Sequence, residues 1–472
     1  MTLDELKKTH PDYDAYIAEW TFFIRSYYGG KLYRDGDYLI QHPFESGKNY
    51  ERRKTIAYYY NYCAPIVDIF VSHLYKTPPK REYGGLGTEP LFKSFLDDSD
   101  LEGSSFASFM RNAQRLASIY GRVSVVIDKP LGKAKTKAEE LENDIRPYLS
   151  IVTPDNVLDW RYVREPSGRQ VLDMIKIKES MTEYRIWNRV TWELWVYNET
   201  EDDQPILADS GAHGLGVVPV VNVYNKSKVT DMIGVSDIQD IADINKNIYY
   251  LCSDATEIIE NTAFPMLAMP YEKGQSEEKK VGPRNILQFD PELANSKPVW
   301  LEAPHSSLEE VREWIAQSVM EIHRIARLGG LVSTTETKQP WSGIALEIKS
   351  EQLYAALIEK ADNMEEAETK ILNVVALWLN TSFNGLIDYP DNFSVRDINE
   401  DFDRAVRSLT EIMIPSKTFT KQAQKKITDS VLPKATDDIR ALIDAEIEAA
   451  GGDTGEEGTD GADGTDGTQT TN

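Results

Sequence analysis

The sequence contains few of the residues that build metal sites and disulfide frameworks. Its 472 residues include 2 cysteines and 6 histidines. Cys63 and Cys252 lie too far apart in the sequence to form a zinc-binding pair, and two cysteines make no disulfide framework. There is no HExxH motif and no close pair of histidines suited to zinc. We therefore expect no metal site, no cofactor and a reducing compartment.

Long apolar runs and nucleotide-binding motifs are absent as well. The longest strongly apolar stretch, Ile371–Leu379, is far too short to span a bilayer, and the N-terminus lacks the features of a signal peptide. The chain has no GxxxxGK[ST] and no GxSxG motif. Residues 84–87 (GGLG) are followed by TEP and not by a helical pattern, so we interpret them as a flexible turn. These observations favour a protein without catalytic residues and without a membrane partner.

Positive charge is also scarce. The chain has 52 lysines and arginines against 77 aspartates and glutamates, which gives a net charge of −25. Proteins that bind DNA tightly neutralise its phosphates with basic side chains, so tight, sequence-reading DNA binding is not expected. A surface past which DNA slides without adhering would instead suit negative charge.

Two local clusters of charge are most simply solvated helix faces. The basic cluster has helical spacing, so its alternative is contact with acidic partners or with DNA. The acidic cluster is Glu365, Glu366 and Glu368, and the basic cluster is Lys417, Lys421, Lys425 and Lys426.

The N-terminal half combines helical and strand patterns. One strand, Tyr184–Tyr197, shows the clearest alternation of apolar and polar residues. Trp187 and Trp195 fall on its polar side, where we expect them to pack against a neighbouring element or subunit. We also predict helices over residues 3–28, 51–75 with an interruption at Pro65, and 104–120, and strands over residues 122–128, 148–152, 174–178 and 217–224.

Two amphipathic helices dominate the second half. The first should start at Ser236, with Gln239 in a capping-box position, and run to about residue 261. The second should be capped by Ser307, with Glu310 in the box position, and stop at residues 329–330 (GG). Between them, residues 264–304 contain six prolines and short strand candidates at 266–269, 285–289 and 299–301.

Each of these two helices has an apolar stripe that must be covered. The stripe of the second helix consists of Leu308, Val311, Ile315, Val319, Ile322 and Ala326. Neighbouring copies packed around a ring would cover such stripes, and so would pairing of the two helices within one subunit. We expect the ring arrangement, while the sequence leaves both open.

The C-terminal third is helical and then low in complexity. A polar loop, residues 331–343, precedes a very long helical pattern over residues 344–380. Shorter helices should fill residues 401–450. From residue 451 the chain is rich in glycine, threonine and aspartate, so we expect it to be disordered.

This order of parts resembles the bacteriophage portal protein family, the head-to-tail connectors, including the uncharacterised portal-like phage proteins. The resemblance spans about residues 10–447, and it depends on the order of several segments and not on one motif. These are residues 59–79 (YYNYCAPIVDIFVSHLYKTPP), 121–130 (GRVSVVIDKP), 157–162 (VLDWRY), 214–224 (GLGVVPVVNVY), 342–346 (SGIAL) and the acidic helical part 432–446.

The resemblance implies a mixed α+β portal fold made of consecutive parts. These would be an α/β wing with N-terminal helices (1–233), a first stem helix (234–261), a small β-containing clip (262–305), a second stem helix (306–328), a tunnel loop (329–343), the long helix of the wing and crown with the crown helices (344–448), and a disordered acidic tail (449–472).

The resemblance also implies a function. Portal proteins form rings, typically of twelve subunits, at one capsid vertex of the virion after assembly in the host cytoplasm. Viral double-stranded DNA passes through the ring during packaging and ejection. The clip meets the large terminase subunit, which holds the ATPase site, and later the head–tail adaptor; the major capsid and scaffolding proteins are further expected partners. Alternatives are another oligomeric virion protein such as an adaptor, although adaptors are generally smaller, or a metal-dependent hydrolase with scattered carboxylates.

Two sets of contact residues follow from this resemblance. In the tunnel loop, the candidates to face DNA are Thr334, Thr335, Lys338, Gln339 and Trp341. In the clip, the candidates to contact partners are Tyr271, Lys279, Lys280, Arg284 and Trp300. Trp341 could equally anchor the base of the following helix. We expect the wall of the channel to be largely electronegative.

Overall fold

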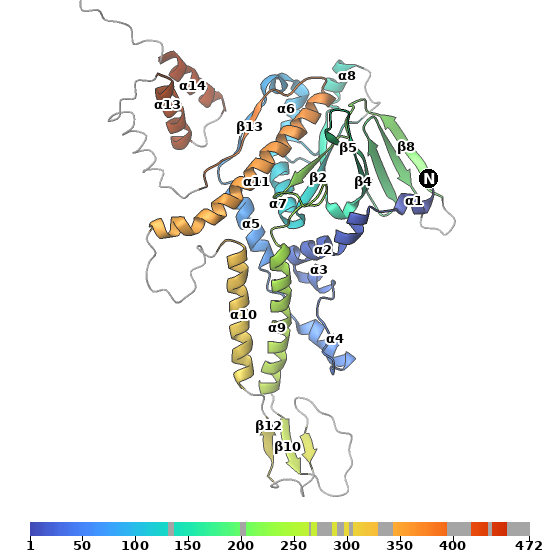
Figure 1. The fold of residues 1–472 in the computed structure, drawn as a ribbon, viewed down its shortest axis with the longest axis vertical. Helices are drawn as coiled ribbons and strands as arrows, with labels where there is room; N and C mark the ends of the chain where they lie inside the picture. The colour runs from blue at the N-terminus through green and yellow to red at the C-terminus, as the bar shows by residue number, and fades with distance from the viewer. Residues whose placement is uncertain are drawn as a thin grey trace, which may run out of the picture. The chain divides into compact units, whose positions relative to one another are not determined.

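A computed structural model gives the fold of the chain. It describes residues 1–130, 136–198, 204–263, 266–270, 286–289, 297–301, 305–328, 343–393, 417–432 and 437–450. The chain divides into two compact units, residues 1–393 and 394–472. The mixture of helices and strands that the sequence predicts is present (Figure 1). Within the described ranges, no helix has the length and apolar character that crossing a membrane requires.

The helices and strands of the first unit are these. Its helices are α1 (Leu3–Lys7), α2 (Pro11–Tyr28), α3 (Gly30–Arg34), α4 (Gly47–Ile56), α5 (Cys63–Leu74), α6 (Pro90–Asp97), α7 (Phe106–Tyr120), α8 (Lys137–Glu142), α9 (Gln239–Ala263), α10 (His305–Ile325) and α11 (Gly343–Trp378), with 3-10 turns η1 (Gly84–Thr88) and η2 (Pro154–Asn156). Its strands are β1 (Lys80–Glu82), β2 (Arg122–Asp128), β3 (Tyr148–Val152), β4 (Val157–Arg164), β5 (Gln170–Lys178), β6 (Glu183–Asn188), β7 (Thr191–Val196), β8 (Ile206–Ala212), β9 (Val220–Tyr224), β10 (Met266–Pro270), β11 (Ile286–Phe289), β12 (Val299–Leu301) and β13 (Leu386–Asp388).

A three-stranded antiparallel sheet, in the order β3-β2-β9, lies at the centre of the first unit. The odd-numbered residues of β2, Val123 and Val125 among them, join a core cluster with residues of α5, α7 and α11. Val126, on the opposite face of β2, packs with Trp160 and Trp187 of the five-stranded sheet β4-β5-β6-β7-β8. Because both faces are covered, β2 is buried at nearly every position and its burial does not alternate.

The predicted strand over residues 184–197 is wrong in one respect, because the segment is a hairpin. Strands β6 and β7 pair antiparallel, with Trp187 opposite Trp192, and the chain reverses at residues 189–190. The hairpin has no glycine or asparagine-glycine pair at this turn, so the usual sequence signal was missing. Trp187 is buried in the core between the two sheets, which confirms that it packs against a neighbouring element.

The N-terminal helices differ from the prediction at two prolines. The single helix predicted over residues 3–28 is two helices, because α2 restarts with Pro11 at its first position and His10 as its cap. The helix predicted over 51–75 is also divided, into α4 and α5, and Pro65 lies in the first turn of α5. The interruption predicted for this segment is therefore confirmed, and the helix restarts two residues before Pro65.

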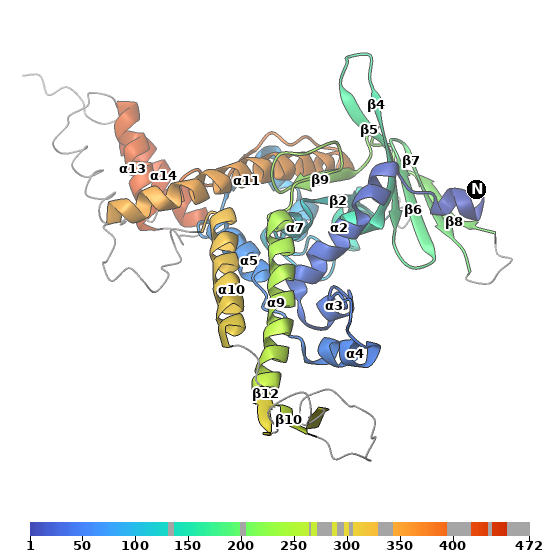
Figure 2. The ribbon, with the colours of Figure 1, turned by 60° about the horizontal axis from the view of Figure 1, so that its bottom comes forward.

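Helices α9 and α10 lie side by side and run in opposite directions (Figures 1 and 2). Ile238 just before α9 and Ala326 just after α10 belong to the same core cluster as residues of α11. The apolar stripe predicted for α10 is partly or fully buried against this cluster along Ile315, Val319 and Ile322. The pairing of the two helices within one chain, one of the two arrangements that the sequence left open, is thus observed, and it covers the stripe in part.

The small sheet between α9 and α10 has the order β11-β10-β12. Strands β10 and β11 are parallel, and β10 and β12 are antiparallel. All three agree with the short strands predicted in this proline-rich segment. The very long helix predicted over residues 344–380 is also confirmed, since α11 extends over 36 residues.

We call residues 30–57, which comprise α3, the following loop and α4, the arm. The arm lies against α9 on the side away from α10, as both ribbon views show (Figures 1 and 2). Its own small core joins Tyr33, Leu39 and Ala57 with Tyr249 of α9. The sequence showed no sign of its packing.

In the second unit the structure describes two helices, α13 (Lys417–Val431) and α14 (Asp437–Ala450). Lys421 and Lys425 of α13 both form ion pairs with Glu448 of α14, with N–O distances of 2.9 and 3.0 Å. Two members of the basic cluster therefore meet an acidic partner within their own unit, one of the alternatives that their spacing left open.

Candidate functional site

Most residues predicted to contact DNA or partners lie outside the described residues. This holds for Thr334, Thr335, Lys338, Gln339 and Trp341 in the predicted tunnel loop, and for Tyr271, Lys279, Lys280 and Arg284 in the predicted clip. Trp300 is described; it lies on β12 and is 60% exposed. The features of the described chain that organise the paired helices are therefore the base of α9 and the arm.

The base of α9 is held by a close backbone contact between two glycines. Gly121 ends α7 in the left-handed region, with φ of 88°. A Cβ on Gly234 would lie 2.1 Å from the carbonyl oxygen of Gly121, so neither position has room for a side chain. Ser236 donates a hydrogen bond to the carbonyl oxygen of Ile119, 2.6 Å away, and thereby joins the same contact. Its predicted capping box is not formed, since α9 begins only at Gln239.

A buried ion-pair network connects the base of α9 to α11. The carboxylate of Asp237 lies 2.6 Å from Nζ of Lys360 and 2.8 Å from Nζ of Lys226. The side chains of Asp237 and Lys360 are completely buried. Lys360 also donates a hydrogen bond to the Asn225 amide oxygen, which accepts another from Ser118 of α7. Residues distant in the sequence are thus tied together at one point.

Opposing effects set the ionisation of this pair. Burial alone would raise the pKa of Asp237, but the ammonium groups of Lys360 and Lys226 outweigh it and lower that pKa to about 2. Burial lowers the pKa of Lys360 to about 8, against the attraction of Asp237. At neutral pH both groups are charged, so the network functions as an ion pair.

The low pKa of Asp237 predicts a loss of stability in acid. A carboxylate whose pKa is lower in the folded chain than in the unfolded chain stabilises the fold at any pH above the unfolded pKa. For Asp237 this contribution disappears as the pH falls from about 4 to about 2. The pKa of Lys360 is also lowered, so its contribution to stability rises between about pH 8 and pH 10.5. Urea unfolding, followed by tryptophan fluorescence at several pH values, measures the pH dependence of the free energy of unfolding on the acid side and on the alkaline side. Asp237→Asn should flatten the acid side, whereas Glu366→Gln, on the exposed face of α11, should not.

Arg53 holds the arm against α9. Its guanidinium is fully buried and donates to both carboxylate oxygens of Glu45, at 2.9 and 2.8 Å, and to the carbonyl oxygen of Ile40 at 2.6 Å. On α9, it contacts Ser253 Oγ at 3.4 Å and lies 3.7 Å from the carboxylate of Asp254. Arg53 therefore fixes the loop of the arm and its position on α9 at the same time.

Further polar contacts strengthen this attachment. His42 Nε2 lies 3.1 Å from the Asp254 carboxylate, and the hydroxyl of Tyr250 donates to the carbonyl oxygen of Ile40 at 2.7 Å. Arg52 forms ion pairs with Glu257 and Glu260. Sequence reasoning missed the whole set, because its members lie about 200 residues apart and form no motif.

The interpretation of the acidic cluster on α11 as a solvated face is wrong for Glu368. This carboxylate is completely buried and receives two hydrogen bonds from Arg81, at 2.8 and 2.6 Å, and one from the hydroxyl of Tyr389 at 2.5 Å. Glu366 on the same helix is exposed and pairs with Lys370, as a solvated face would. The arrangement around Glu368 fixes the antiparallel strand pair β1–β13 to α11.

The glycine-rich segment at residues 84–87 is part of the 3-10 turn η1, and helix α6 follows directly at Pro90. The expectation that no helix follows is therefore wrong. The amide of Gly85 donates to Asn384 Oδ1 at 2.9 Å, and a Cβ on Gly84 would lie 2.2 Å from the same atom. The amide of Gly85 is thus used in a hydrogen bond within the chain.

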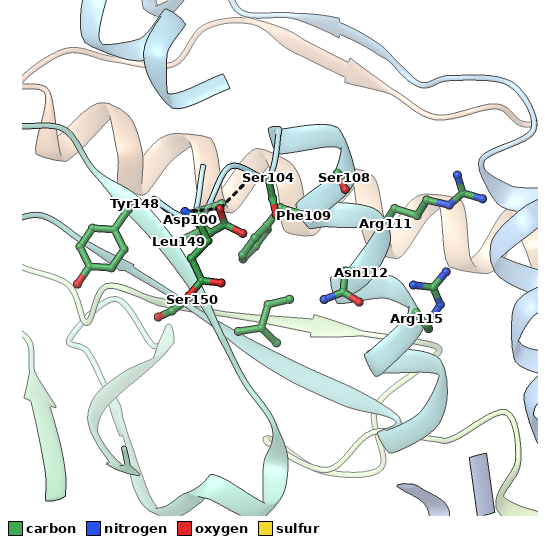
Figure 3. Close-up of a pocket in the computed structure, with 12 residues that line it drawn as sticks. Asp100, Ser104, Ser108, Phe109, Arg111, Asn112, Arg115, Tyr148, Leu149 and Ser150 are labelled. Carbon is green, nitrogen blue, oxygen red and sulfur yellow. Dashed lines mark hydrogen bonds between the residues drawn. The ribbon is translucent and has the colours of Figure 1, made fainter. Parts of the chain in front are cut away.

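An open cleft of about 680 Å³ lies between α7 and β3 (Figure 3). Arg111 and Arg115 line it from α7, and the Asp100 carboxylate lies in the loop before α7. Asp100 accepts hydrogen bonds from the amides of Glu102 and Ser104, each at 3.0 Å, and its pKa is lowered. A carboxylate held in this way orders its loop and is a poor general base at neutral pH.

A second pocket of about 290 Å³ contains Asp128 at the end of β2. Burial raises the pKa of Asp128, although its carboxylate accepts hydrogen bonds from the amide of Lys129 and the hydroxyl of Tyr148. This is the feature nearest to the alternative of a hydrolase with scattered carboxylates. Among the described residues, however, no group of three or more His, Cys, Asp or Glu side chains could hold a metal ion.

The comparisons with known proteins are as follows. No known family matches the chain, and no curated protein matches it in sequence. Among solved structures, a chain from "Neck of empty GTA particle computed with C6 symmetry" aligns with a TM-score of 0.40 at 10% identity, covering 84% of this chain and 98% of that one. A chain from "Virion of native gene transfer agent (GTA) particle" aligns with a TM-score of 0.37 at 12% identity, covering 75% and 86%. Both TM-scores are too low to establish a shared fold.

Proposed function

We propose that the chain is one subunit of a portal-type ring, a structural protein of a phage-like particle through which double-stranded DNA passes. One observation carries this proposal: two long antiparallel helices, α9 and α10, flank a small three-stranded sheet in the sequence, and the 36-residue helix α11 follows them. This is the order of stem, clip, stem and long helix that the resemblance implied.

In this proposal, the parts have the roles that the sequence suggested. Residues 1–233 form the wing, 234–261 and 306–328 the stem helices, 262–305 the clip, 329–343 the tunnel loop and 344–448 the long helix and crown. The subunit has no catalytic site of its own and relies on a terminase for ATP hydrolysis. The exposed indole of Trp300 on β12 supports the clip as a place where a terminase or adaptor docks, because exposed aromatic side chains are favoured at interfaces.

The pairing of α9 with α10 inside one chain leaves the ring to be supported by other surfaces. Trp314 and Met320 of α10 remain 57% and 49% exposed, while the apolar stripe of the helix is partly or fully buried along Ile315, Val319 and Ile322. Large apolar side chains that remain exposed on a helix of charged residues favour a further contact between proteins. The net charge of −25 per chain supports a channel through which DNA slides without sticking.

The ring has a direct test in the mass of the purified chain. Twelve copies of the 53.5 kDa chain would have a mass of about 642 kDa, and we expect light scattering to find an assembly of this order that negative-stain images show as a ring. A stable single chain of 53.5 kDa at all accessible concentrations would contradict the proposal. A ring that binds no terminase would contradict only the proposed partner.

A further inference from the structure

We propose that the arm of one copy binds the outward face of α10 of the next copy, so that the arm and α10 are the two halves of the interface that closes the ring. This inference rests on the proposed function and adds the residues that make the contact. Its occupant is a second copy of this chain.

The loop of the arm exposes apolar side chains although it is firmly held. Phe44 is fully exposed and Ile40 is 61% exposed. Both lie in the loop that the buried Arg53 fixes through Glu45 and the carbonyl oxygen of Ile40. Ordering a loop costs conformational entropy, and apolar side chains that stay exposed in the free chain gain no free energy of burial to offset that cost. A second surface that covers them explains why the loop is held in this way.

The arm and α10 lie on opposite sides of α9. An α-helix turns about 100° per residue. Tyr250, Asp254 and Glu257, which contact the arm, therefore share one side of α9. Ile248 and Cys252, which belong to the core cluster that includes α10, share the other. Both ribbon views show the same order of α10, α9 and α4 (Figures 1 and 2).

The exposed face of α10 is the second half of the proposed interface. Measured around the helix from the buried Ile322, Met320 and Glu313 point roughly to the opposite side. Trp314 lies at the flank of this exposed face. A contact across a two-fold axis uses the same patch on both copies. Here the two patches differ and lie on opposite sides of the chain. They associate head to tail, and such contacts close into a ring when the rotation allows it.

The charges of the two surfaces are complementary. Near the start of α10, Glu309, Glu310 and Glu313 are exposed around a single exposed arginine, Arg312, and these glutamates have no ion-pair partner in the part of the chain that the structure describes. On the arm, Lys31, Arg34 and Lys48 are exposed and have no such partner there. The exposed carboxylates of the arm are Asp35, Asp37 and Glu51, and the last two pair with Lys54. Opposite charges on two apolar-centred surfaces steer and orient association.

The two surfaces also lie at the same level along the helix pair. Arg52 of the arm pairs with Glu260, near the end of α9. Because α10 runs back along α9, its acidic N-terminal half lies beside this end (Figure 1). A copy that places its α10 against the arm of the next copy is therefore not displaced along the helix axis. This favours a flat, closed ring over an open helical filament.

The first experiment compares the mass of three chains by light scattering. We expect the full-length wild type to form the large assembly and the double variant Ile40→Ser/Phe44→Ser to run as a single chain of 53.5 kDa. Ile206→Ser is the matched control, since Ile206 is 64% exposed on β8, away from both surfaces, and it should assemble like the wild type. Unchanged thermal unfolding of both variants would show that they are folded.

The second experiment tests that the contact is head to tail. A chain with Trp314→Ser/Met320→Asp retains its arm, and Ile40→Ser/Phe44→Ser retains its α10, so each alone should stay single. Mixed in equal amounts, they can form one intact contact, and we expect a species of two chains and nothing larger.

The outcomes separate the inference from the proposed function. If the wild type is a large ring and the arm variant assembles equally well, the inference is wrong and the portal function stands. If the wild type is a single chain, both are wrong. If the mixture of the two variants yields no two-chain species, the head-to-tail contact between arm and α10 is wrong.

Discussion

Replacing Asp237 with alanine should destabilise the first unit by about 3–5 kcal/mol, because the substitution leaves Lys360 buried and without its partner. The side chain of Lys360 is completely buried, so water cannot replace the lost carboxylate. Lys226 loses the same partner, although it is partly exposed. Urea unfolding followed by tryptophan fluorescence at pH 7 measures the change in the free energy of unfolding.

The control for this experiment lies on α11, the helix that contains Lys360. Glu366→Ala removes the exposed pair with Lys370 on α11 and should change the free energy of unfolding by less than about 0.5 kcal/mol. The double variant Asp237→Leu/Lys360→Met replaces both charges with apolar groups and should recover most of the loss. If Asp237→Ala is no more destabilising than the control, the buried pair does not hold α9 to α11.

The second large effect is expected at Gly234. A Cβ at this position would lie 2.1 Å from the carbonyl oxygen of Gly121 and 2.5 Å from its carbonyl carbon. These are backbone atoms, so α7 and the segment before α9 must separate to accept an alanine. We expect Gly234→Ala to cost about 3 kcal/mol, at the upper end for overpacking.

Gly47→Ala is the matched control for Gly234→Ala. It adds the same methyl group at a position with open space around it, and it should leave stability within about 0.5 kcal/mol or raise it slightly. Thermal unfolding of both variants tests the difference. Equal melting temperatures for the two variants would show that the two backbone segments can separate freely.

The long elements of this fold could be predicted from the sequence because their signals are local. Helices α9, α10 and α11 each repeat an apolar pattern over many turns, and β2 is rich in valine and isoleucine. The prolines and glycines around them mark their ends. Errors arose where the local signal was ambiguous, as at Pro11, or missing, as at the turn between β6 and β7.

The groups that organise the site could not be predicted in this way. Glu368 has the sequence neighbourhood of a solvated helix face, and only Arg81, 287 residues away, makes it a buried one. Asp237 and Lys360 are 123 residues apart, and Arg53 and Ser253 are 200 apart. Such pairs depend on the complete tertiary structure, and a single sequence contains no pattern that connects them.

The buried pair of Asp237 and Lys360 has a mechanical consequence. Lys360 lies in the middle of α11, and near the end of the same helix the indole of Trp378 donates to the carbonyl oxygen of Ile127 on β2. Helix α11 is therefore anchored at two points, one to the base of α9 and one to the central sheet. A load applied along α9 cannot be absorbed by a local hinge at its base. We expect such a load to tilt α9 and α11 together as one rigid body about the contact with the central sheet.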